Sequence, residues 1–181
     1  MQKKEKGNVI MEKIKIGISS CLLGEKVRYD GEQKLDPLIK DFPGQCFEYI
    51  AVCPEVECGL GVPRQPMRLE GHPDSPLLIV TENRKDITER MVIWAQKRLI
   101  QLEEEYLCGF IFKSNSPSCG LNKVNVFNKD SIPEKIGTGI FAAIFMKHFP
   151  LLPVLDEVQL HDSRLRANFI KRVRALKSSV K

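Results

Sequence analysis

Short apolar runs alternate with longer amphipathic segments along most of the chain. The short runs are rich in Ile, Val, Leu and Phe, and each is bounded by Gly, Pro or polar residues, a pattern that predicts strands. We expect strands at residues 13–21, 47–55, 77–83, 107–114, 124–128 and 152–155. The run at 107–114 has almost no polar interruption, which is typical of a parallel strand covered on both faces.

Apolar residues at helical spacing predict helices between these strands. The longest is expected at 86–106, with others at 34–42, 139–149 and 162–176. Strands that alternate with helices predict an α/β layered fold, Rossmann-like, with a mainly parallel sheet. Residues 58–76, rich in Gly and Pro, are expected to form a loop. We expect one α/β domain at 13–181, preceded by a flexible N-terminal tail at 1–12.

Composition narrows the class of protein. The 181 residues are 43% hydrophobic and 28% charged, as in an ordinary soluble globular protein. No apolar run is long enough for a membrane helix, and the charged N-terminus does not resemble a signal peptide. We therefore expect a cytoplasmic protein that does not bind membranes. In that compartment, six cysteines favour metal or catalytic roles over disulfides.

The net charge of +5 is concentrated in the C-terminal segment, "RLRANFIKRVRALKSSVK". A basic amphipathic helix of this kind can bind nucleic acid, which leaves open a nucleic-acid-binding module with a structural metal. A solvated helix face is the commoner explanation of such a segment. We therefore do not expect nucleic acid as a partner.

Three cysteines lie at, or just after, the carboxyl ends of predicted strands: Cys21, Cys53 and Cys119. In open α/β sheets, ligands bind beyond the carboxyl ends of the strands. If these strands are parallel neighbours, the three thiols converge on one edge of the sheet. Cys46 and Cys108 are instead expected to be small buried hydrophobic residues.

Three thiolates without a fourth protein ligand leave one coordination position open, as in a catalytic rather than a structural site. Soft sulfur ligands select an iron–sulfur cluster, zinc or copper(I), and the residues alone leave this choice open. Glu55 is a candidate acid or base. Polar and basic residues near the cysteines are candidates for binding a small polar substrate, a phosphate or an aromatic base: Ser19, Ser20, Arg28, Tyr29, Asp30, Arg64, Arg68, Ser116 and Ser118.

Three motifs occur in a fixed order: "GISSCLLGEKVRYDG", "VCPEVECGLGVPR" and "KSNSPSCGL". Together they resemble the thiouracil desulfidase (TudS) family, formerly a family of unknown function. The resemblance covers residues 14–173 and is strongest to a branch that often continues into a second, C-terminal domain. Here the chain stops at Lys181, so such a domain is absent or supplied in trans by a partner.

The resemblance implies a compact α/β domain and a 4Fe–4S cluster held only by Cys21, Cys53 and Cys119. Aerobic preparation can destroy or replace such a cluster. A thiolated uracil, nucleoside or nucleotide would bind the open iron through its sulfur, and water would replace that sulfur without electron transfer. This hydrolase-like desulfidase would use Glu55 and Ser116 as catalytic residues. Substrate contacts are expected from Ser20, Arg28, Tyr29, Asp30, Arg64 and Ser118.

The sequence also departs from the family pattern. The second motif reads Val-Glu-Cys-Gly-Leu where characterised desulfidases have a glycine-rich loop, so Cys58 becomes a candidate extra ligand or sulfur acceptor. The alternative within the same chemistry is a sulfur carrier or donor, in which the cluster passes sulfide to an acceptor other than water.

Overall fold

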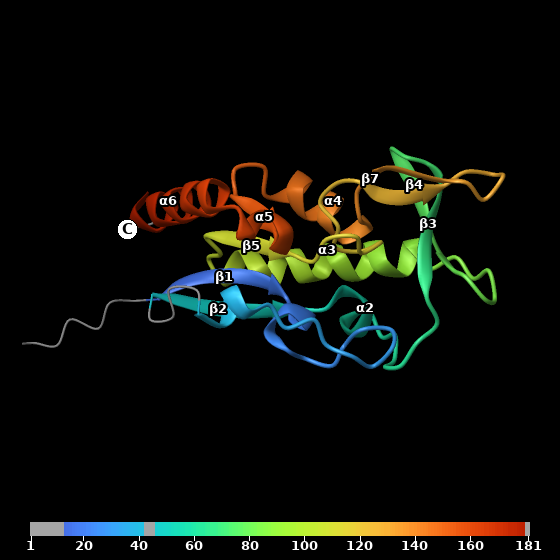
Figure 1. Ribbon diagram of the computed structural model, residues 1–181, viewed down its shortest axis with the longest axis horizontal. Coiled ribbons are helices and arrows are strands. Elements are labelled where there is room, and N and C mark those ends of the chain that lie inside the picture. Colours follow the sequence, from blue (N-terminus) through green and yellow to red (C-terminus); the bar gives the residue numbers. More distant parts are fainter. Residues whose placement is uncertain (1–12, 42–45, 180–181) are drawn as a thin grey trace, which may run out of the picture.

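The chain folds into two sheets with helices packed around them (Figure 1). The computed structural model describes residues 13–41 and 46–179, so the N-terminal tail expected at 1–12 lies outside the described residues. Within the described residues, each sheet has four strands. No described helix is long and apolar enough to cross a membrane.

The first sheet is entirely parallel, as the uninterrupted apolar runs predicted. Its strands in spatial order are β2 (Phe47–Val52), β1 (Ile14–Ser19), β5 (Gly109–Phe112) and β8 (Val154–Asp156). The chain leaves β1 for β2 on one side, whereas β5 lies on the other side. The loops after β1 and β5 therefore diverge, and this strand order creates a crevice at their carboxyl ends.

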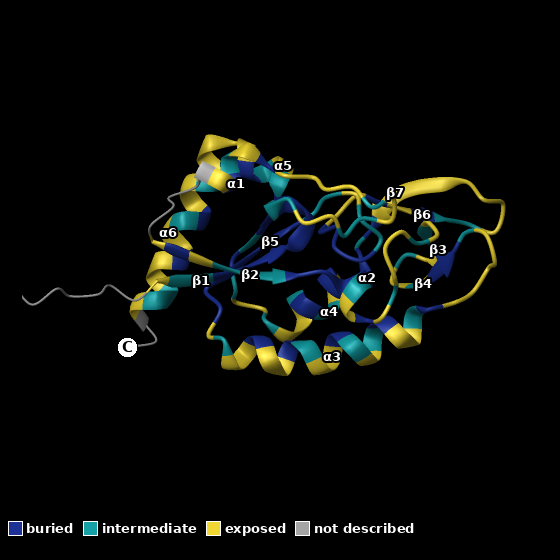
Figure 2. Cartoon of the chain, turned by 90° about the horizontal axis from the view of Figure 1, so that it is seen from below, coloured by how far each residue is buried: buried dark blue, intermediate teal, exposed yellow. Residues whose placement is uncertain are grey.

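Helices cover both faces of the parallel sheet (Figure 2). One face carries α1 (Pro37–Asp41), α5 (Glu157–His161) and α6 (Ser163–Ser179), and the other carries α3 (Thr88–Glu104) and α4 (Ile140–His148). Side chains of β1 alternate between the two layers. Ile16 and Ile18 pack with Phe169 and Val173 of α6.

The layer between the sheet and α3/α4 is aromatic. Phe110 and Phe112 of β5 pack with Phe141 and Phe145 of α4, and the Phe110 and Phe145 ring centroids are 4.8 Å apart. Gly17 of β1 lies beneath this cluster. A Cβ atom at Gly17 would lie 2.2 Å from the Phe110 ring, so glycine is what permits the aromatic packing.

A second sheet is added to the predicted α/β fold with its parallel sheet. Its strands in spatial order are β4 (Ser75–Val80), β3 (Met67–His72), β6 (Val124–Phe127) and β7 (Pro133–Gly137). Only the β3–β6 pair is parallel. Leu69, Leu78 and Val126 of this sheet pack against Met91 near the start of α3.

Two strands of the second sheet were not predicted. Residues 58–76 were expected to be a loop, yet Met67–His72 form β3. In β3 only Leu69 is fully buried, and flanking Pro and Gly residues obscure the alternation. In β7 every residue but the last is exposed. Such strands are stabilised by pairing with neighbours rather than by a hydrophobic run of their own, so the pattern does not reveal them.

Short helices also replace predicted strand ends. The strand expected at 47–55 ends at Val52, and Pro54–Glu57 form the helix α2. Similarly, β1 ends at Ser19 and is followed by a short 3-10 helix, η1 (Ser20–Leu23). These strand-to-helix junctions position the first two of the three strand-end cysteines.

Candidate active site

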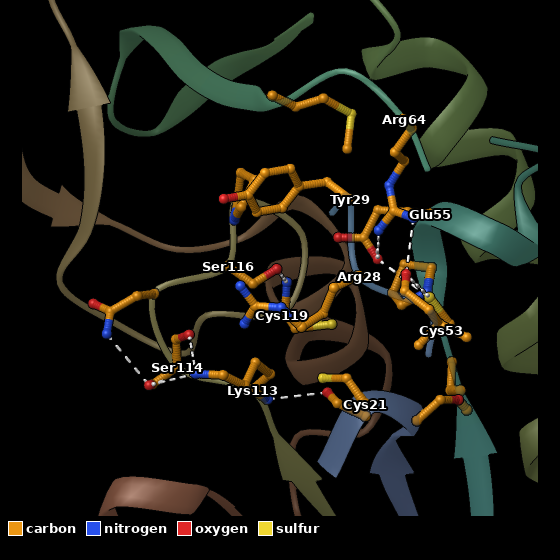
Figure 3. A pocket seen from close by; sticks show the side chains of 18 of the residues that line it. Cys21, Arg28, Tyr29, Cys53, Glu55, Arg64, Lys113, Ser114, Ser116 and Cys119 are labelled. Carbon is orange, nitrogen blue, oxygen red and sulfur yellow. Dashed lines mark hydrogen bonds and ion pairs between the residues drawn. The ribbon is translucent and has the colours of Figure 1, made fainter. Parts of the chain in front are cut away.

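A cavity of about 440 Å³ opens at the carboxyl ends of β1, β2 and β5 (Figure 3). This volume suits a small ligand or cofactor. The start of β3 adds a wall from the second sheet. The described residues that line the cavity are Ser19, Ser20, Cys21, Val27, Arg28, Tyr29, Val52, Cys53, Pro54, Glu55, Arg64, Pro66, Met67, Lys113, Ser114, Asn115, Ser116, Pro117 and Cys119.

Cys21 lies inside η1, two residues after the end of β1. This helix ends at Gly24, whose φ of 92° is in the left-handed region that favours glycine. The Cys21 carbonyl accepts hydrogen bonds from the backbone N–H groups of Gly24 (3.3 Å) and Lys34 (2.9 Å). Both ends of the intervening loop therefore meet at Cys21, which fixes the backbone that carries its thiol.

Cys53 directly follows β2 and is the N-cap of α2. Pro54 occupies the first helical position, where its fixed φ is favourable and its missing N–H has no cost. The Cys53 backbone N–H donates to Glu57 Oε1 at 2.9 Å. Glu57 also pairs with Arg98 of α3 at 3.0 Å, so the Cys53 turn is connected to α3.

Cys119 lies in the turn that follows β5. The Ser116 hydroxyl oxygen accepts hydrogen bonds from the backbone N–H groups of Ser118 (3.2 Å) and Cys119 (3.0 Å). Two glycines allow this turn to pack closely. A Cβ atom at Gly120 would lie 2.8 Å from the Ser116 carbonyl oxygen, and one at Gly139 would lie 2.5 Å from the Ser118 carbonyl.

The three thiols are buried around one carboxylate. Burial raises the pKa of Cys21 to about 11 and that of Cys53 to about 12, and it raises the pKa of Cys119 well above its ordinary value. The negative charge of Glu55 is the second cause of all three raised pKa values. A cation bound among these thiols would act in the opposite direction, because it stabilises thiolates.

This donor set fits an iron–sulfur cluster. The cavity is lined by three cysteine thiols and by no histidine among the described residues. In the described part of the chain, no group of three or more His, Cys, Asp or Glu side chains is arranged to hold a single metal ion. In a four-iron cluster each cysteine binds a different iron, so its ligands lie farther apart than those around one ion.

The mouth of the cavity carries a cation and an aromatic ring. The Arg28 guanidinium donates to both carboxylate oxygens of Asp30, at 3.2 and 3.1 Å. The guanidinium carbon lies 5.7 Å from the centroid of the Tyr29 ring, which is 46% exposed. The mouth can therefore contact a flat, polar ligand by stacking and by hydrogen bonds.

Sequence reasoning missed Lys113, Ser114 and Asn115 in the cavity wall, and it missed Glu157 behind it. Glu157, the first residue of α5, accepts hydrogen bonds from Lys113 Nζ, the Ser114 N–H and the Ser114 hydroxyl. The Lys113 backbone N–H donates to Ser19 Oγ at 3.0 Å, which connects β5 to β1. Lys113 itself was an available signal. It directly follows a buried strand, and a lysine at a buried position is normally paired with a carboxylate.

The structure brings most of the predicted site residues together, while their roles stay predictions. The cavity is lined by Ser20, Cys21, Arg28, Tyr29, Cys53, Glu55, Arg64, Ser116 and Cys119. Asp30 and Ser118 are not among its lining residues, and Ser118 is fully buried. Arg68 lies on β3, where it pairs with Glu70.

The remaining cysteines lie elsewhere. Cys58, a candidate extra ligand from the sequence, lines a second surface hollow with Arg90 and Trp94 and packs in the core under the second sheet. Cys108 is buried, as predicted, whereas Cys46 is exposed, so the prediction that it is buried was wrong. Cys46 directly precedes β2 and belongs to none of the hydrophobic clusters of the described residues.

Comparisons with known proteins agree with this geometry. The sequence model of the 2-thiouracil desulfurase family matches residues 16–157. The uncharacterized protein YbbK of Bacillus subtilis (strain 168) is 32% identical over 151 residues, which are 80% of this chain and 97% of YbbK. A solved structure, the [4Fe-4S]-dependent thiouracil desulfidase TudS, matches with a TM-score of 0.66 and 30% identity, covering 86% of this chain and 99% of TudS.

Proposed function

Because the chain belongs to the 2-thiouracil desulfurase family, we propose that it removes sulfur from a thiolated pyrimidine with the help of a 4Fe–4S cluster. The substrate would be a thiouracil, a thiouridine or its nucleotide. The observation that carries this proposal is the convergence of three strand-end cysteines on one cavity. The name of the TudS structure, a [4Fe-4S]-dependent thiouracil desulfidase, supports it.

Cys21, Cys53 and Cys119 are the residues that would hold the cluster. When bound, the cluster supplies a Lewis-acidic iron without a protein ligand, which polarises a thiocarbonyl sulfur. The three cysteines are at most 9% exposed, so the protein shields the cysteine side of the cavity from water. The cavity volume of about 440 Å³ suits a base-sized substrate and not a folded nucleic acid.

The reaction exchanges one sulfur atom for one oxygen atom and moves no electrons. The oxygen of water bonds to the thiocarbonyl carbon, the carbon–sulfur bond breaks, and the sulfur leaves as hydrosulfide. Glu55 is the proposed general base, since it is the only carboxylate among the described residues that line the cavity. It would take one proton from the attacking water and pass it to the sulfur, which leaves as hydrosulfide, and then take the second proton from the oxygen and release it to solvent as the pyrimidine carbonyl forms.

Ser116 is the proposed hydrogen-bond donor. Its oxygen already accepts two backbone N–H groups, which fixes the hydroxyl at the cavity wall. Its own proton remains available to donate to a heteroatom of the pyrimidine as negative charge develops there. Ser20, Arg28 and Tyr29 line the same cavity and are the proposed contacts to the rest of the substrate.

Product analysis tests this function. Protein loaded with the cluster under anaerobic conditions would be incubated with thiouracil, thiouridine and thiouridine monophosphate. We expect the oxygenated pyrimidine and free sulfide in equal amounts from at least one of them. A thiolated acceptor molecule in place of free sulfide would indicate a sulfur carrier. A protein with a complete cluster that leaves all three compounds unchanged would contradict the proposal.

A further inference from the structure

Arg64 is the one cavity-lining arginine that is nearly buried. Its side chain is only 10% exposed, whereas the Arg28 side chain at the mouth is 29% exposed. A buried guanidinium is costly unless its surroundings compensate its charge and its five N–H donors. The contacts of Arg64 therefore indicate what the protein gains by burying it.

One set of contacts connects Arg64 to the loop that follows η1. The Arg64 backbone N–H donates to the Tyr29 carbonyl at 2.8 Å, and Arg64 Nη1 donates to the Val27 carbonyl at 2.8 Å. Nη1 also lies 3.4 Å from the Gly61 carbonyl, within its own loop. Arg64 thus fixes the segment that brings Arg28 and Tyr29 to the cavity mouth.

The other edge of the guanidinium faces Glu55 (Figure 3). Nη2 lies 3.8 Å from Glu55 Oε2, an ion pair beyond hydrogen-bond distance. Nε, whose N–H is parallel to one N–H of Nη2, is buried without a hydrogen-bond partner in the described structure. The same Glu55 oxygen is 3.6 Å from Cys53 Sγ. Glu55 Oε2 therefore lies between the Cys53 thiol and an arginine edge on which Nε has no hydrogen-bond partner among the described residues.

We infer that Arg64 is a positioning residue, which holds the Glu55 carboxylate in the cavity and fixes the 27–29 loop over it. This inference deepens the proposed function and rests on it, since it assigns Arg64 to the general base rather than to the substrate. The Nε–Nη2 edge is the donor pair that carboxylates accept in bidentate fashion. A small movement of the loop that carries Arg64 toward Glu55 in α2 would let Glu55 accept hydrogen bonds from both Nε and Nη2.

Kinetics separate positioning from substrate binding. If Arg64 positions Glu55, Arg64→Gln lowers kcat by about 100-fold, because a displaced base slows chemistry, whereas KM rises by less than about tenfold, through the loosened loop that carries Arg28 and Tyr29. Arg64→Lys restores the charge but not the fork, and should recover only about tenfold of that loss. Glu55→Gln alone should lower kcat by about 1,000-fold. Adding Arg64→Gln to Glu55→Gln should lower kcat by less than about threefold more.

A matched control separates this role from loss of stability. Arg90 also donates to two backbone carbonyls, those of Cys58 and Gly59, but it does not line the cavity. Arg90→Gln should lower the melting temperature and leave kcat and KM within about twofold of the wild type. Iron content should be unchanged in all these variants, because no cysteine is altered.

Hydrogen exchange in the cluster-free protein provides a readout that does not depend on activity. Arg64→Gln should speed exchange of the Arg28 and Gly31 amides, whose hydrogen bonds lie within the loop, by about tenfold or more. Unchanged exchange, an increase in KM alone, or losses for Arg64 and Glu55 that multiply independently would overturn the inference. A cluster-loaded wild type that removes no sulfur would end the proposed function, and the exchange data would still decide whether Arg64 fixes the loop.

Discussion

At the scale of single residues, each cavity cysteine is positioned by the backbone of its own turn. The Cys21 carbonyl closes the loop after η1, the Cys53 N–H is bound by Glu57, and the Cys119 N–H is bound by Ser116. These hydrogen bonds fix the backbone that carries each thiol without using the sulfur atoms. The Cys53 sulfur makes only long contacts, to Glu55 Oε2 at 3.6 Å and to the Val27 carbonyl at 3.9 Å.

Loss of one ligand should remove the cluster. We expect Cys119→Ala to lose most of its bound iron, its visible absorption and its desulfidase activity together, because two cysteines cannot retain a cluster that three hold. Cys58→Ala is the matched control, since Cys58 does not line the cavity, and it should keep the iron content of the wild type. Iron analysis after anaerobic purification measures both, and equal iron in the two variants would refute the ligand assignment.

Ser116 should matter for stability as well as for chemistry. Ser116→Ala leaves the backbone N–H groups of Ser118 and Cys119 without their acceptor, which we expect to cost about 1–2 kcal/mol of unfolding free energy. Ser178→Ala, in an exposed last turn of α6, should cost less than about 0.5 kcal/mol. Urea unfolding compares the two variants. A Ser116→Ala protein as stable as the Ser178→Ala protein would contradict this account of the turn.

At the scale of elements, α5 stabilises the cavity wall through one carboxylate. The side chains of Glu157 and Lys113 are 12% and 16% exposed, so their ion pair is mostly buried. We expect Glu157→Gln to lower the free energy of unfolding by about 2–4 kcal/mol, because it leaves the Lys113 charge buried without a partner. The half-exposed pair of Glu105 with Lys15 offers a control, and Glu105→Gln should cost less than about 1 kcal/mol.

Chemical denaturation measures both costs. Similar small losses for Glu157→Gln and Glu105→Gln would show that the α5 contact is not a structural support of the site. Glu157→Gln should also lower the desulfidase activity, because it displaces the segment from Lys113 to Cys119. Glu105→Gln should keep the activity, because Glu105 lies at the C-terminal end of α3.

The second sheet should lose stability in acid. Hydrogen bonds from Arg84, and then from Arg68, hold the pKa of Glu70 at about 2. A carboxyl whose pKa is lowered by folding stabilises the protein above its unfolded pKa, and that contribution fades as the pH falls from about 4.5 to about 2. Because the Arg84 side chain is 56% exposed, solvent screens this pair. We therefore expect Glu70 to contribute no more than about 1 kcal/mol to the free energy of unfolding.

Glu70→Gln tests this pH dependence. The variant should be less stable than the wild type in urea at neutral pH, and the difference should shrink as the pH approaches 2. Arg84→Gln should behave in the same way, since it removes the larger cause of the lowered pKa. A difference that stays constant over this pH range would show that the ion pair is not its origin.

At the scale of the whole molecule, the parallel strand order creates the crevice and the second sheet closes one side of it through Pro66 and Met67. The sequence predicted the parallel sheet and the convergence of Cys21, Cys53 and Cys119, because apolar runs mark buried strands and parallel strands end at one edge. These features depend on local pattern and on a general rule of topology.

Other features depend on contacts that no local pattern contains. Glu157 reaches Ser114 across 43 residues, and β3 exists because it pairs with β4 and β6. The sequence around β3 is rich in Pro and Gly residues, and a single buried leucine in the strand does not make an alternating pattern. Tertiary pairing overrides local propensity at such places.

The most direct test of the central claim is iron and acid-labile sulfide analysis of the wild-type protein, purified and reconstituted without oxygen. A cluster held by three cysteines predicts about four irons and about four sulfides per chain, with the broad visible absorption of a cubane. A colourless protein that binds neither iron nor sulfide under these conditions would contradict the claim that the three strand-end cysteines form a cluster site.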